Sequence, residues 1–118
     1  MRQVTAVDGF RLAYDRDGRG PAAVLLHGWP GDRADYEQVA PLVAGAAEVI
    51  TPDLRGFGES DKHQADPAGQ YSAAAQARSV AALIEELGLA RPVIAGYDIG
   101  SRIAQTLAAA RPDLVRAL

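Results

Sequence analysis

Short apolar runs separated by turn residues predict a sheet in this chain. Two alternating runs are joined by Asp8 and Gly9, which tolerate a positive φ and so predict a tight hairpin. The later runs are continuously apolar, as in strands covered on both faces. Residues 52–69 are polar and predict a long loop. The predicted strands span residues 3–7, 10–14, 22–26, 48–51 and 92–96, and residues 114–118 resemble the start of another.

Helical patterns alternate with these strands. Asp35 is a candidate N-cap of a first helix, which Pro41 bends or breaks. Ser72 is a good N-cap for a second helix, and Gly88 a good stop. An alanine-rich third helix is predicted over residues 99–110. This order predicts an α/β fold, a three-layer α/β/α sandwich whose mainly parallel sheet opens with an N-terminal hairpin.

Composition excludes several classes of protein. The 118 residues are 48% hydrophobic and 23% charged, with a net charge of −3, which indicates a globular domain without a nucleic-acid surface. No apolar run approaches the ~18 residues of a membrane span. With no cysteine, neither a disulfide framework nor a thiolate metal site is expected. No motif predicts a cofactor, and we expect a soluble, cytoplasmic protein.

The turn between the last predicted strand and the last predicted helix carries an acid. Asp98 stands there with Gly96 two positions before it and Gly100 two positions after it. Such a sharp turn crowds its neighbours, which must be small, and raises the central side chain out of the sheet. Helical N-capping is the alternative role for an aspartate at this position.

A carboxylate at such a turn suits one kind of chemistry. Aspartate has an ordinary pKa of about 3.9, so it is anionic at neutral pH and needs no base to become a nucleophile. Attack on saturated carbon gives an ester that water cleaves later, whereas a serine would leave a stable ether. Asp98 therefore predicts displacement at an epoxide or carbon–halogen bond.

Three motifs together resemble the N-terminal half of an α/β-hydrolase, closest to epoxide hydrolases and their dehalogenase relatives. They are His27-Gly28-Trp29-Pro30, residues 53–61 and residues 96–100. The resemblance implies that Asp98 is the nucleophile and that the backbone N–H groups of Trp29 and Ile99 form an oxyanion hole. It also implies a cis peptide bond before Pro30. The remaining motif residues have structural roles: His27, Gly28, Pro30, Gly96 and Gly100.

Neither histidine occupies the position of the family's catalytic base, which comes late in the chain. His27 ends a buried strand and is expected to be structural, and His63 is expected to be solvated. We therefore expect residues 1–118 to be the N-terminal half of a core domain whose cap and C-terminal half are absent. We expect this half alone to be inactive and to expose an apolar sheet edge. Asp53, Arg55 and Asp61 are expected to hold their loop.

Comparison with the resembled enzymes narrows the range of expected substrates. Haloacetate dehalogenases hold the carboxylate of their substrate with two arginines. This chain has a counterpart of only one of them, Arg102, because Ile99 stands at the position of the other. Ile99 also lacks the side-chain N–H that many haloalkane dehalogenases offer to halide. A small apolar epoxide is thus the leading substrate. A dehalogenase is the alternative enzyme, and a non-catalytic ligand-binding protein is the alternative of another class.

Overall fold

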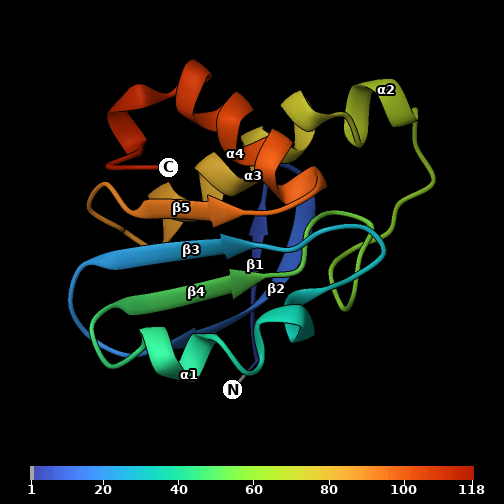
Figure 1. Cartoon of the computed structure of the whole chain (residues 1–118). Helices are drawn as coiled ribbons and strands as arrows, with labels where there is room; N and C mark the ends of the chain where they lie inside the picture. Colours follow the sequence, from blue (N-terminus) through green and yellow to red (C-terminus); the bar gives the residue numbers. More distant parts are fainter. Residues whose placement is uncertain (1) are drawn as a thin grey trace.

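The computed structural model describes residues 2–118, whose strands form one mixed sheet in the order β1-β2-β4-β3-β5 (Figure 1). β3 runs parallel to both β4 and β5, while β2 is antiparallel to β1 and β4. The strands are β1 (Arg2–Val7), β2 (Phe10–Asp17), β3 (Ala22–Leu26), β4 (Glu48–Pro52) and β5 (Val93–Gly96). The mixed sheet and its N-terminal hairpin confirm the predicted fold class.

The hairpin turn follows from its dipeptide. Asp8 has φ 49° and Gly9 has φ 81°, so both adopt the left-handed backbone of a tight turn. The register pairs Val7 with Phe10 directly across this turn.

Helices cover both faces of the sheet. α1 (Ala40–Val43) packs on β4, whereas α3 (Ala73–Glu86) and α4 (Ile99–Ala110) pack together on the other side (Figure 1). The core between these two helices and the sheet is built from buried apolar side chains, most of them aliphatic. Its most buried members include Leu12, Val24, Ile50, Val80, Ile84 and Ile94.

The boundaries of α3 are those that the sequence predicts. The Ser72 hydroxyl accepts a hydrogen bond from the Ala75 N–H, and Gly88 follows the helix with φ 65°. α4 also has its predicted bounds.

The first helical segment departs from the prediction. It divides into η1 (Arg33–Tyr36), a 3₁₀ turn, and α1, with Pro41 in the first turn of α1. The predicted N-cap Asp35 is wrong, because Asp32 has the extended backbone of a cap and accepts from the Ala34 N–H.

Two other predicted segments need correction. The long polar loop ends earlier than predicted, since α2 (Pro67–Gln70) forms a helical turn that Asp66 caps. Residues 114–118 do not form a regular strand. Leu114 is the last residue of the 3₁₀ turn η2 (Pro112–Leu114), and Ala117 makes a single parallel bridge to Val93. The 3₁₀ turn follows from Pro112, which fixes φ at a helical value.

Candidate active site

Asp98 sits at the bend between β5 and α4 in a strained conformation. Its φ of 54° and ψ of −126° are unusual for a residue with a side chain. The side chain is exposed and makes no hydrogen bond to the amides of α4, although the residue holds the N-cap position. The alternative role of helix N-cap is therefore wrong, and the carboxylate stands free of its own helix.

The flanking glycines permit this bend. A Cβ on Gly96 would lie 2.5 Å from the carbonyl oxygen of Gly100, and a Cβ on Gly100 would lie 2.4 Å from that of Leu26. Both distances are far below van der Waals contact, and the opposing atoms belong to the backbone. Small residues are thus required on both sides of Asp98, as the sequence predicts.

The loop after β3 approaches Asp98 from the other side. The Trp29 N–H donates to Oδ2 of Asp98 at 2.9 Å, and the Trp29–Pro30 peptide bond is cis, as expected. Gly28 makes the approach possible, since a Cβ there would lie 2.9 Å from Cβ of Asp98. Within residues 2–118 the Ile99 amide, at the first position of α4, makes no backbone hydrogen bond. Trp29 is 67% exposed in this part of the chain, so its side chain is not part of the core.

The side chain of His27 lies between two loops. Its fully buried ring accepts the Leu54 N–H at Nε2 (3.0 Å), which leaves the proton on Nδ1 to donate to the Gly28 carbonyl (2.9 Å). Both ring nitrogens are thus occupied in joining the loops that follow β3 and β4. His63 is half exposed, but it packs against Phe10 and hydrogen-bonds to the Gly9 carbonyl instead of being merely solvated.

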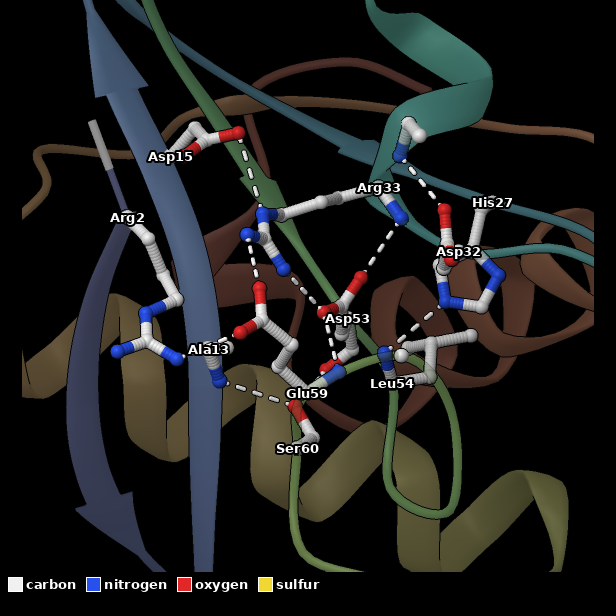
Figure 2. A network of polar contacts seen from close by, with 12 residues as sticks. Arg2, Ala13, Asp15, His27, Asp32, Arg33, Asp53, Leu54, Glu59 and Ser60 are labelled. Carbon is white, nitrogen blue, oxygen red and sulfur yellow. Dashed lines mark hydrogen bonds and ion pairs between the residues drawn. The ribbon is translucent and has the colours of Figure 1, made fainter.

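An ion-pair network holds these two loops together (Figure 2). The buried carboxylate of Asp53 accepts from the backbone N–H of Arg33 at 2.7 Å and of Glu59 at 2.9 Å, and from the Arg33 guanidinium at 2.5 Å. The same guanidinium reaches Asp15 and Glu59. Burial disfavours its charge, but hydrogen bonds to Glu59 and Asp53 outweigh burial and raise the pKa of Arg33.

Arg55 and Asp61 hold the rest of the loop after β4, as expected. Arg55 is fully buried, pairs with Asp8 and lies 4.3 Å above the Phe10 ring. Asp61 accepts from the backbone and side chain of Arg11, and that backbone N–H is the main cause of its lowered pKa.

A tyrosine that the sequence analysis did not single out adjoins Asp98. The Tyr97 hydroxyl donates to Oδ2 of Asp35 at 2.5 Å, which links the bend to η1. This hydrogen bond is the main cause of a raised pKa for Tyr97. The neighbouring Tyr36 donates to the Leu26 carbonyl, and burial is the main reason that its pKa rises to about 12.

Open space surrounds the bend. A pocket of about 380 Å³ is lined by Asp98 and by side chains of the first turns of α4, including the exposed Arg102. A second pocket of about 570 Å³ lies between the loop after β4 and α4, where Ile99 and Phe57 contribute apolar walls. Its volume is in the range of small-molecule sites. Asp98 does not line this second pocket, and the accessibility of its carboxylate follows from its exposed position beside the first.

The chain resembles known hydrolases along nearly its whole length. It is 36% identical over 112 residues to the soluble epoxide hydrolase of Corynebacterium sp. (strain C12), and this alignment covers 95% of the chain and 38% of the relative. It is 37% identical to the haloalkane dehalogenase of Bradyrhizobium diazoefficiens, covering 93% of the chain and 35% of that relative. The ligand-free structure of epoxide hydrolase CorEH superposes with a TM-score of 0.91 and 33% identity, covering 98% of the chain and 39% of that structure.

The chain spans little more than a third of the length of these curated relatives. No helix within residues 2–118 is long and apolar enough to cross a bilayer. Residues 21–118 match the family described as the alpha/beta hydrolase fold. The chain therefore belongs to the alpha/beta hydrolase fold family.

Proposed function

We propose that residues 1–118 are the N-terminal part of a longer hydrolase that opens epoxides with Asp98 as its nucleophile. One observation carries the proposal: an accessible carboxylate is held at positive φ, detached from its own helix and hydrogen-bonded to the Trp29 amide. Binding alone would not require a strained acid, and strain of this kind is often found at catalytic residues. The epoxide hydrolase relatives support the choice of substrate.

In the first step, one oxygen of Asp98 attacks an epoxide carbon. A C–O bond forms to Asp98 as the epoxide C–O bond breaks, and its electron pair goes to the epoxide oxygen. That oxygen takes a proton from an acidic hydroxyl group supplied outside residues 2–118. The product of this step is a hydroxyalkyl ester of Asp98.

In the second step, water adds to the carbonyl carbon of the ester. A general base from the rest of the enzyme accepts the water's proton, since both ring nitrogens of His27 are engaged elsewhere. The negative charge that develops on the carbonyl oxygen is stabilised by the N–H groups of Trp29 and Ile99. A donor of this kind contributes about 3 kcal/mol. Collapse of the intermediate releases the diol and restores the carboxylate of Asp98.

Dehalogenation is the second candidate, because a haloalkane dehalogenase is among the relatives at 37% identity. The same attack would then expel a halide ion instead of an alkoxide. Against it, Ile99 has no side-chain N–H to bind the departing halide.

A rapid-quench experiment tests the proposal. The complete enzyme is mixed with less than one equivalent of styrene oxide or 1-bromobutane, quenched in acid, digested and analysed by mass spectrometry. We expect an ester on the peptide that contains Asp98, with the epoxide as the better substrate. Faster bromide release would favour the dehalogenase, and an adduct on another residue would refute Asp98 as nucleophile. Sustained turnover by residues 1–118 alone would refute the proposal that this is only part of the machinery.

A further inference from the structure

Tyr97, the residue before Asp98, connects the bend between β5 and α4 to the loop after β3. The proposed oxyanion donors Ile99 and Trp29 lie at this bend and in this loop. We propose that Tyr97 and Asp35 form a positioning pair that holds the Trp29 N–H in place for hydrolysis of the ester. This inference rests on the proposed function. It assigns a role to Tyr97, a motif residue for which no role has been proposed, and to Asp35, which lies outside the family motifs. The pair joins positions 62 residues apart by a hydrogen bond of 2.5 Å.

The Tyr97 ring contacts the loop after β3 at its beginning. A Cβ on Gly28 would lie 2.7 Å from Cε2 of Tyr97, so the ring packs directly on the backbone of Gly28. The next residue is Trp29, whose N–H donates to Asp98. Movement of this ring would therefore move the amide beside it.

The Tyr97 hydroxyl holds the same loop at its other end. Its acceptor Asp35 lies in η1, and the Asp35 carboxylate lies against the backbone of Gly31, where a Cβ would be 2.1 Å from Oδ2. Residues 28–35 are thus held between the ring and the hydroxyl of one side chain. The edge-to-face contact of Tyr36 with Tyr97, with ring centroids 6.1 Å apart, supports the ring from a third direction.

The two chemical steps respond differently to a displaced Trp29 amide. Before attack, the N–H stabilises the charge on Asp98, and this charge is lost as the ester forms. Displacement of the Trp29 N–H therefore does not slow the attack of Asp98 on the epoxide. During hydrolysis, charge develops on the ester carbonyl oxygen, so the same change slows hydrolysis. A general loosening of the fold would slow both steps.

The experiment uses single-turnover kinetics of the complete enzyme with styrene oxide, following the Asp98 ester by mass spectrometry. In Tyr97→Phe and Asp35→Leu we expect ester formation at the wild-type rate or faster, and hydrolysis roughly three- to tenfold slower. The ester then accumulates. Asp35→Asn keeps a carbonyl acceptor for the hydroxyl, and we expect it to restore hydrolysis.

Tyr14→Phe is the matched control. It removes a hydroxyl that bonds Thr5 and Gln3 in the hairpin, and we expect both steps to be unchanged. Wild-type hydrolysis in Tyr97→Phe, or equal slowing of both steps, would overturn the positioning role while Asp98 remained the nucleophile. Failure of the wild-type enzyme to form an ester on Asp98 would instead refute the proposed function, and the positioning role with it.

Discussion

Gly100→Ala is the most informative single change to the fold at the bend. Gly100 lies in the first turn of α4, where helix propensity alone favours alanine over glycine by up to about 1 kcal/mol. The structure predicts the opposite sign. The new Cβ would lie 2.4 Å from the Leu26 carbonyl oxygen and 2.6 Å from that of His27.

The size of the stability loss depends on which atoms the new Cβ would contact. Both oxygens belong to backbone at the end of β3, where Leu26 pairs with Gly96 of β5, so neither can rotate aside as a side chain would. Overpacking of a rigid site costs about 1–3 kcal/mol. With the gain in helix propensity set against the upper part of that range, we expect a net loss of about 2 kcal/mol.

Urea unfolding of the complete enzyme measures this loss, with Gly45→Ala as the control. A Cβ on Gly45 would lie 3.7 Å from its nearest neighbour, so we expect that variant to stay within about 0.5 kcal/mol of wild type. Turnover by Gly100→Ala should fall by about tenfold or more, because α4 would push the end of β3 and the Trp29 loop away from Asp98. A Gly100→Ala protein as stable as wild type would refute the close approach of α4 to β3.

Three further predictions concern charged residues. Asp98→Gly should abolish turnover yet raise stability by about 1 kcal/mol in urea unfolding, because glycine tolerates φ 54°; a less stable variant would contradict the strain. Asp53→Asn should lower stability by about 3 kcal/mol, since it leaves the Arg33 guanidinium without its buried partner; a loss under 1 kcal/mol would contradict this. The pKa of Glu59 is lowered chiefly by its hydrogen bond from the Arg33 side chain, and the pKa of Asp61 chiefly by its hydrogen bond from the Arg11 backbone N–H. Their stabilisation is present above about pH 4 and is lost as the pH falls through the lowered values, so stability measured from pH 7 to 3 should decline below pH 4. Stability that stays constant over that range would contradict it.

Features set by neighbouring residues were predictable from the sequence. Asp8 and Gly9 alone determine the hairpin turn, and Ser72 and Gly88 bound α3. The bend at Asp98 was predictable for a related reason, because its glycines are needed where α4 meets the backbone beside it.

Features set by distant residues were not predictable. Asp35 matched a helix cap in the sequence, but its carboxylate binds Tyr97, and Asp32 caps the turn. The ion pair of Arg33 with Asp53 could not be predicted from the sequence, because the two residues lie 20 positions apart. Such pairs form only when β3, β4 and β5 align in the sheet, and no local pattern encodes that alignment.

The central claim is that an oxygen of Asp98 enters the product. A single turnover of the complete enzyme with styrene oxide in H₂¹⁸O tests it most directly. Because water attacks the ester carbonyl, we predict a first-turnover diol without ¹⁸O and an Asp98-containing peptide that gains one ¹⁸O. A labelled diol from the first turnover, together with an unlabelled peptide, would mean that water opens the epoxide directly and would contradict the account.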